Sequence, residues 1–237
     1  MALQPHIGEG AFRDEPKIDE GPIIDGKPTS ISTWSAKQLK DCALLPGLFK
    51  TINLAYLTSD EKSFGTSTGD RLKSTEDLIQ VLRNDANSFI IILNQTHSDR
   101  EVLSTASCRR YYGPESDTSR AWACTHTPAP GVEEWELKLV ATHPSAQGKG
   151  LASYMLGLTE KEVVSRFNAR EGSRRKAAAA QSHPKMIMCT PETTFAEFYA
   201  RRGYGKDYVR PFKNDHIGFD INFMSKMLDP KDGDHME

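Results

Sequence analysis

The stretch EWELKLVATHPSAQGKGLASYMLGLTEKEVVSRF, residues 134–167, decides how this chain folds. Its first part alternates with the two-residue period of a half-buried strand. One face of that strand is predicted to hold Trp135, Leu137, Leu139 and Ala141. The other face is predicted to hold Glu134, Glu136, Lys138 and Val140. After a break at His143-Pro144-Ser145, apolar residues recur from Leu151 at the spacing of one helix face.

The turn between this strand and this helix reads Gln147-Gly148-Lys149-Gly150-Leu151-Ala152. The first N–H groups of a helix lack internal partners, and the helix dipole adds partial positive charge there. Gly148 and Gly150 have no Cβ to keep a phosphate from the backbone. A Rossmann loop is excluded because Ser153 replaces its third glycine, and the P-loop pattern is absent. We interpret the turn as a pyrophosphate cradle, the alternative being an ordinary tight turn before a helix.

The composition is that of a soluble globular protein, with 38% hydrophobic and 26% charged residues among 237. A net charge of −2 favours neither nucleic acid nor an anionic membrane as a partner. We find no bilayer-spanning apolar run and no signal-peptide pattern, so a cytoplasmic protein is expected, with a nuclear location left open. The four cysteines have no metal-ligand spacing, so no metal site is predicted.

The elements expected along the chain alternate between helices and strands. Residues 1–30 are predicted to be an irregular arm, with room for one edge strand, and 229–237 a polar tail. Capping patterns predict helix starts at Ser35, Ser74 and Thr194, and residues 58–69 are polar and expected to be mobile. Strands are predicted at 89–93, 101–108, 134–141, 186–189 and 217–223. Residues 113–131 form a long loop, and in 168–184 the helix either lengthens or becomes a linker.

Two motifs in this order resemble those of the GNAT superfamily, the acyl-CoA-dependent N-acyltransferases. Gln147-x-x-Gly150-x-Ala152 resembles motif A of that family, with Pro144 three residues before it. Phe198-Tyr199-Ala200-Arg201-Arg202-Gly203-Tyr204 resembles its F-Y-x-x-x-G-[FY] signature. The resemblance covers about residues 31–228 and implies a mixed, mostly antiparallel α/β sheet flanked by helices and splayed at the CoA-binding strand. Gln147 and Ala152 stand where many members have Arg and Gly, and Thr193 or Thr194 stands near the place of a common Asn.

The resemblance further implies acetyl-CoA as the acetyl donor and a primary amine as the acceptor. The backbone of Gln147, Gly148, Lys149, Gly150, Leu151 and Ala152 would hold the pyrophosphate. By register with motif A, Val140 and Thr142 would pair with the pantetheine amides. Lys149 is the better prediction for a phosphate contact, because the basic run Arg174-Arg175-Lys176 is more simply a solvated face.

Glu136 and Tyr199 are the predicted catalytic residues. Glu136 precedes Gln147 by 11 residues, the spacing of the catalytic glutamate in histone-acetylating members. A partly buried carboxylate with a raised pKa would remove the ammonium proton, with Glu134 or a water chain as alternatives. Tyr199 matches the family tyrosine that points toward the CoA sulfur, and a neutral phenol can protonate a departing thiolate. The alternative is a packed aromatic whose hydroxyl bonds to backbone.

The sequence thus predicts an N-acetyltransferase acting on a small-molecule amine. A protein or peptide N-acetyltransferase and a catalytically silent CoA-binding module are the alternatives. The two long segments, 113–131 and 168–184, could cap a small pocket, which favours the first function. The identity of the amine and the oligomeric state, monomer or homodimer, are left open.

Overall fold

The computed structural model describes residues 15–65, 69–83, 87–96, 101–114, 122–174, 183–213 and 217–233. The strands of these residues are β1 (Lys17–Glu20), β2 (Thr29–Ser35), β3 (Phe89–Gln95), β4 (Val102–Tyr111), β5 (Val132–Thr142), β6 (His183–Pro191), β7 (Gly205–Lys213) and β8 (Gly218–Met227). The helices are α1 (Ala36–Leu39), α2 (Leu45–Phe64), α3 (Thr75–Leu82), α4 (Leu151–Arg174) and α5 (Ala196–Ala200). Two 3-10 turns are η1 (Pro144–Ala146) and η2 (Pro230–Gly233).

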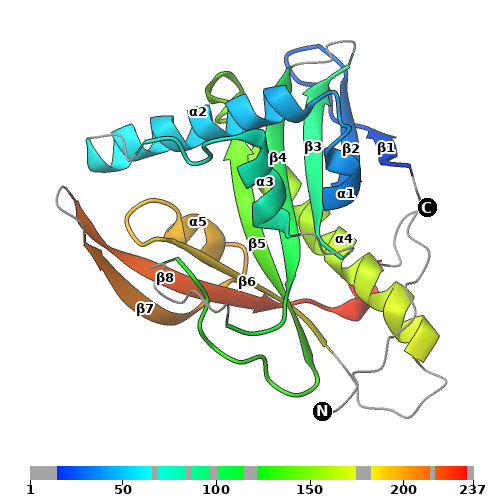
Figure 1. The fold of residues 1–237 in the computed structure, drawn as a ribbon, viewed down its shortest axis with the longest axis vertical. Helices are drawn as coiled ribbons and strands as arrows, with labels where there is room; N and C mark the ends of the chain where they lie inside the picture. The colour runs from blue at the N-terminus through cyan, green and yellow to red at the C-terminus, as the bar shows by residue number, and fades with distance from the viewer. Residues whose placement is uncertain are drawn as a thin grey trace.

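The eight strands form one sheet in the order β1-β2-β3-β4-β5-β6-β8-β7. Neighbouring strands are antiparallel except β5 and β6, which are parallel and are joined through α4. Figure 1 shows α1, α2 and α3 on one face of the sheet and α4 on the other. The predicted mixed, mostly antiparallel sheet flanked by helices is confirmed.

Strand β3 explains why the sheet is covered on both faces. Its five apolar residues are all buried, as the unbroken run in the sequence predicted. Phe89, Ile91 and Leu93 pack in the core beneath α4, whereas Ile90 and Ile92 pack in the core beneath α2 and α3. The two cores therefore lie on opposite faces of the sheet, and β3 contributes a different set of side chains to each of them.

Strand β5 does not keep the single apolar face that its alternation predicted. Its register with β4 shifts between Ser107↔Lys138 and Thr105↔Ala141, so β5 carries one extra residue there. At this bulge Leu139 adopts the left-handed region, with φ of 49°. Trp135 and Leu137 face the α4 core, but Leu139 and Ala141 face the α2 core. The prediction of one shared face is wrong beyond Leu137, because the extra residue reverses the alternation.

The parallel pairing of β5 with β6 is short. It runs from Val132↔His183 to Glu136↔Ile187 and then stops, while β6 remains paired with β8 as far as Pro191↔Ile221. The second half of β5 and the second half of β6 therefore diverge. This opening is visible in Figure 1 between the upper parts of β5 and β6. The splay predicted at the cofactor strand is confirmed.

Two of the helices before β3, α1 and α3, begin at the capping residues that the sequence predicts, whereas the N-cap of α2 is Leu44, which makes no side-chain hydrogen bond. The Ser35 side chain accepts a hydrogen bond from the Gln38 N–H, and the Gln38 side chain accepts one from the Ser35 N–H at 2.8 Å. At the start of α3 the Ser74 side chain likewise accepts a hydrogen bond from the Asp77 N–H. The Asp77 carboxylate accepts from the Lys73 N–H. Helix α2 runs through Phe64 and ends at Gly65, so most of the segment 58–69 expected to be mobile is helical.

Three further predictions are corrected or extended by the structure. Thr194 does not cap α5, whose N-cap is Phe195 without a side-chain hydrogen bond. Strand β7 was missed because it is a polar, half-exposed edge strand with Pro211 inside it, a pattern that resembles a loop. Helix α4 lengthens to Arg174, and the rest of the basic run lies outside the described residues.

The predicted limits of the domain, 31–228, stay a prediction, as do the arm and the tail. Within the described part of the arm, β1 pairs with β2 at the edge of the sheet, and β2 itself begins at Thr29. No helix in the described ranges is both long enough and apolar enough to cross a membrane.

Replacing Ser35 by Ala should lower the free energy of unfolding by about 1 kcal/mol, because the Gln38 N–H at the start of the helix loses its side-chain acceptor. Ser35→Asp keeps an acceptor at the cap and should recover most of the loss. Urea denaturation of both variants measures the difference. Equal stability of Ser35→Ala and the parent protein would contradict the structural importance of this cap.

Candidate active site

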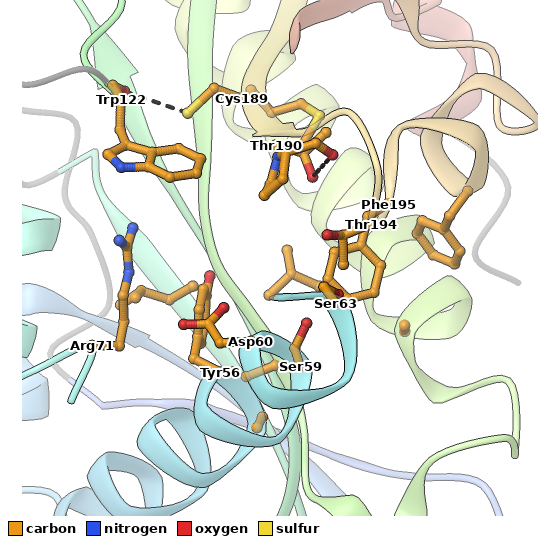
Figure 2. A pocket seen from close by; sticks show the side chains of 18 of the residues that line it. Tyr56, Ser59, Asp60, Ser63, Arg71, Trp122, Cys189, Thr190, Thr194 and Phe195 are labelled. Carbon is orange, nitrogen blue, oxygen red and sulfur yellow. Dashed lines mark hydrogen bonds between the residues drawn. The ribbon is translucent and has the colours of Figure 1, made fainter. Parts of the chain in front are cut away.

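A cavity of about 670 Å³ fills the opening between the diverging halves of β5 and β6. Its floor is the whole run of β5 from Leu137 to Thr142. One wall comes from α2 and the residues after it, and the opposite wall from β6, α5 and the β7–β8 hairpin. Figure 2 shows α2 side chains such as Tyr56 and Asp60 across the space from Trp122 and Cys189. The cavity thus collects residues from most of the chain around one unpaired strand edge.

The predicted cradle lies at one end of this cavity, where a smaller hollow of about 240 Å³ sits over the turn. Gly148 and Gly150 both have φ of +78°, a conformation that side chains other than glycine disfavour. A Cβ at either glycine would point into open space, so the backbone is accessible. The first helical hydrogen bond of α4 is donated by Tyr154 to the Gly150 carbonyl at 3.1 Å. Among the described residues, no backbone bond uses the N–H groups of 148–153, which leaves them for an anion.

The predicted pantetheine residues, Val140 and Thr142, both line the main cavity. They lie beyond Glu136, where β5 has lost its partner strand β6. Gln147 donates from Nε2 to the Thr142 carbonyl at 3.3 Å, which ties the glycine turn to the end of the strand. Lys149 is engaged by the Asp25 carboxylate and by the Ser145 carbonyl, so its predicted phosphate contact stays a prediction.

Tyr199 lines the same cavity from α5. Its ring is 7% exposed and makes edge contacts with Phe198 and Tyr204, at centroid distances of 5.0 and 5.7 Å. Burial raises the pKa of Tyr199 far above its ordinary value, and the nearby Tyr56 phenol adds to the effect. The hydroxyl therefore stays protonated at neutral pH and can donate.

Glu136 lies under the cavity and does not line it. Its carboxylate is 1% exposed and accepts from Arg109 at 2.7 Å (Nε) and 2.6 Å (Nη2), and it also pairs with Lys138. Burial alone would raise the pKa of Glu136, but Lys138 and Arg109 hold it below its ordinary value. The expectation of a raised pKa is wrong, because sequence reasoning did not place Arg109 opposite Glu136 on β4.

Glu134 lies two residues before Glu136 on β5 and occupies a similar buried position. It is 2% exposed and pairs with His126 at 2.5 Å and with Lys185 at 3.3 Å. Like Glu136, it is absent from the residues that line the cavity. Each buried carboxylate of β5 is thus neutralised by cations from other elements, as Glu133 is by Arg110 and Arg170. These pairs stabilise the strand, and neither glutamate faces the open space.

The sequence did not single out the α2 residues of the site. Tyr56, Ser59, Asp60 and Ser63 follow the spacing i, i+3, i+4, i+7 and all line the cavity. The helical spacing of these residues was the signal, but the segment 58–69 was expected to be mobile. Trp122, which lies within the long segment 113–131, lines the cavity, whereas Tyr111 is buried and its hydroxyl donates to the His126 carbonyl at 2.6 Å. Tyr112 is 61% exposed.

No protein-family model matches the chain, and no curated protein matches it. Among solved structures, a protein of Acinetobacter baylyi described as a candidate acetyltransferase gives a TM-score of 0.52 at 16% identity, covering 85% of this chain and 93% of that one. YncA of Salmonella typhimurium, also described as a candidate acetyltransferase and solved with acetyl-CoA, gives a TM-score of 0.49 at 19% identity. That match covers 84% of this chain and 94% of YncA. The Escherichia coli ribosomal-protein-S18-alanine N-acetyltransferase gives a TM-score of 0.48 at 13% identity, and the match covers 84% of this chain and 94% of that one.

The likeness to the Acinetobacter protein extends over nearly the whole of both chains, and it shows that this chain has an acetyltransferase fold. The mixed, mostly antiparallel sheet flanked by helices is the arrangement that the resemblance to the GNAT superfamily implied. The identity of 16% carries the comparison no further than the fold.

Glu136→Gln should lower the free energy of unfolding at pH 7 by about 3–5 kcal/mol, because it leaves Arg109 and Lys138 as buried cations without their anion. The folded pKa of Glu136 is depressed, so its stabilisation is complete above the unfolded pKa of about 4.3 and is lost as pH falls through the folded value. Urea denaturation between pH 3 and pH 7 should therefore show that the difference in free energy of unfolding between the parent protein and Glu136→Gln becomes smaller as the pH falls.

Glu197→Gln is the matched control, because that carboxylate is 83% exposed and only 3.6 Å from Arg201 in a surface pair. It should change stability by less than about 0.5 kcal/mol. A Glu136→Gln protein as stable as this control would show that the buried cluster does not stabilise the fold.

Proposed function

We propose that the protein is an N-acetyltransferase that transfers the acetyl group of acetyl-CoA to a primary amine of a small molecule. One observation carries the proposal: the unpaired half of β5 and Tyr199 line one cavity, and the hollow over the glycine turn adjoins that cavity through shared lining residues, Thr142, Gln147 and Ala152 among them. A thioester cofactor needs these three features in this order, a phosphate site, an extended backbone to pair with, and a proton donor at the sulfur.

In this proposal the pyrophosphate lies over the backbone of Gln147, Gly148, Lys149, Gly150, Leu151 and Ala152. Oriented amides at a helix start bind such an anion without a net positive charge. The pantetheine arm then runs along Val140 and Thr142, whose strand edge has no partner beyond Glu136. Peptide-like amides of the arm can satisfy these backbone groups as a neighbouring strand would. The thioester carbonyl would therefore lie near the bulge at Leu139.

The reaction needs no metal or redox group, and its protons balance with the residues present. The ammonium first loses one proton, since an alkyl ammonium has a pKa of about 10.4. The neutral nitrogen attacks the thioester carbon, an N–C bond forms, and the C–S bond breaks as the tetrahedral intermediate collapses. Tyr199 donates its proton to the leaving thiolate and regains one from the amide nitrogen. The products are the N-acetylated amine, free CoA and one proton released to solvent.

Three groups are candidates for the base that removes the ammonium proton: Glu136, Glu134 and a water chain. Glu136 stays a prediction for that role, but its lowered pKa and its position beneath the cavity make it a weak base for an amine. Glu134 is equally enclosed. The third alternative, a water chain in the cavity, needs no enclosed carboxylate and is the one that this geometry favours.

The enclosure of the cavity favours a small acceptor over a protein. Phe64 of α2 and Phe219 of β8 stack at a centroid distance of 4.7 Å, so the two walls meet at the end away from the cradle. A peptide acceptor would need an open groove there.

Gly150→Glu should weaken acetyl-CoA binding by well over tenfold, which corresponds to about 1.4 kcal/mol. The new carboxylate enters the anion cradle, and the φ of +78° disfavours any side chain. Gly157→Glu is the matched control, because it adds the same charge to α4 at a site with open space and without positive φ. Calorimetry measures both, with circular dichroism to confirm folding. Unchanged affinity in a folded Gly150→Glu protein would refute the cradle.

Tyr199→Phe should lower the rate constant at saturating acetyl-CoA by about 10²-fold or more, because only the proton donor is removed while the ring packing is kept. Its melting temperature should change little. Tyr154→Phe, at a 38% exposed tyrosine of α4, is the control and should retain full turnover. Turnover within twofold of the parent across the pH range would assign Tyr199 to packing.

A further inference from the structure

The end of the cavity away from the cradle is built from aromatic rings. Trp122 lies 6.1 Å from Phe212 and 5.6 Å from Phe219, measured between ring centroids. Phe212 and Phe219 are 4.9 Å apart, and Phe219 stacks on Phe64. All four residues line the cavity and are partly exposed to it. This group, Phe64, Trp122, Phe212 and Phe219, is called the aromatic wall below.

The opposite side of the same space is the polar face of α2. Tyr56, Ser59 and Asp60 point toward the space across from Trp122 in Figure 2. Of the described residues that line the cavity, only Asp60 and Asp70 carry a carboxylate, and Asp70 is exposed next to Arg71 at the mouth. Arg71 stacks over the Tyr56 ring, 5.1 Å from its centroid, and is itself exposed. Asp60 is therefore the less exposed of the two carboxylates that line the cavity.

The position of Tyr56 connects this face with the reaction centre. Its phenol is close enough to Tyr199 to raise the pKa of that hydroxyl. Asp60 is one helical turn beyond Tyr56, a rise of about 5.4 to 6 Å along α2. An amine held between them would have Tyr199 on one side and the aromatic wall on the other. Lys138 also lines the cavity, but its ammonium is already paired with Glu136.

We propose that the acceptor is an arylalkylamine, a primary amine joined by a short linker to a flat aromatic ring. The inference rests on the proposed acetyl transfer and specifies its acceptor. The ring packs against the aromatic wall, where offset and edge contacts between aromatic rings add to the gain from area burial. The Asp60 carboxylate receives the ammonium before it loses its proton. A linear polyamine has no ring to pack on this wall, and among the described residues that line the cavity only Asp60 and Asp70 offer carboxylates for its several charges.

Three probe amines separate these possibilities. 2-Phenylethylamine has the aromatic ring, 2-cyclohexylethylamine has the same carbon skeleton without aromaticity, and spermidine is a polyamine. The expected result is a kcat/KM for 2-phenylethylamine at least tenfold above that for spermidine and several-fold above that for 2-cyclohexylethylamine. Spermidine as the best substrate, or equal rates with all three, would overturn the proposal.

Two variants test the residues. Trp122→Leu keeps apolar bulk but removes the ring, and Asp60→Asn removes the charge; each should raise the KM for 2-phenylethylamine at least tenfold with the KM for acetyl-CoA unchanged. Tyr112→Leu and Asp41→Asn are matched controls at exposed positions outside the cavity and should leave both constants as they are. If Trp122→Leu and Asp60→Asn behave like their controls, the acceptor does not occupy this end.

Failure of this inference is distinguishable from failure of the proposed function. Calorimetric titration of acetyl-CoA into the parent protein tests the function, and titration of 2-phenylethylamine into the CoA-saturated protein tests the acceptor site without requiring turnover. No binding of acetyl-CoA would remove the proposed function and the acceptor with it. Acetyl-CoA binding without 2-phenylethylamine binding would overturn the acceptor alone.

Discussion

The loss of hydrogen bonding between β5 and β6 after Glu136 is the constraint on which the site depends. A buried strand edge needs partners, because an unpaired buried backbone group costs about as much as a lost hydrogen bond. Here the edge from Leu137 to Thr142 opens into a cavity instead of a neighbouring strand. The chain thus keeps a row of backbone donors and acceptors for an extended ligand, and every other part of the site is arranged around that row.

The bulge at Leu139 and the buried ion pairs hold this edge in place. The left-handed residue costs about 1–2 kcal/mol, and the burial of Leu139 at 2% exposure in the α2 core offsets that cost. Below the bulge, Glu133, Glu134 and Glu136 are each 3% exposed or less and each meets at least one cation. A strand with three buried carboxylates within four residues depends on its cationic partners to fold. The same glutamates that suggest a catalytic base in the sequence therefore stabilise the start of the splay.

The two ends of the cavity have different physical characters, and the difference follows from the elements that build them. The cradle is made of backbone, from a turn whose glycines are held at positive φ. The far end is made of side chains from α2, β7 and β8 together with Trp122, which are distant in sequence. A cofactor that many proteins share can be bound by backbone geometry, whereas an acceptor that differs between proteins is recognised by side chains.

The sequence by itself determined the mixed α/β class, the strand–turn–helix unit, the caps at Ser35 and Ser74, and the resemblance to the GNAT superfamily, because each of these is set by residues close together in the chain. Tyr199 and the glycine turn, which the sequence singled out, line two adjoining hollows in the tertiary structure, while their roles stay predictions. Only the tertiary structure decided the bulge, the lowered pKa of Glu136, the polar edge strand β7 and the aromatic wall. Each of these depends on pairing or packing between distant segments, such as Arg109 opposite Glu136. A local sequence pattern does not specify which distant residue will lie next to it in the fold.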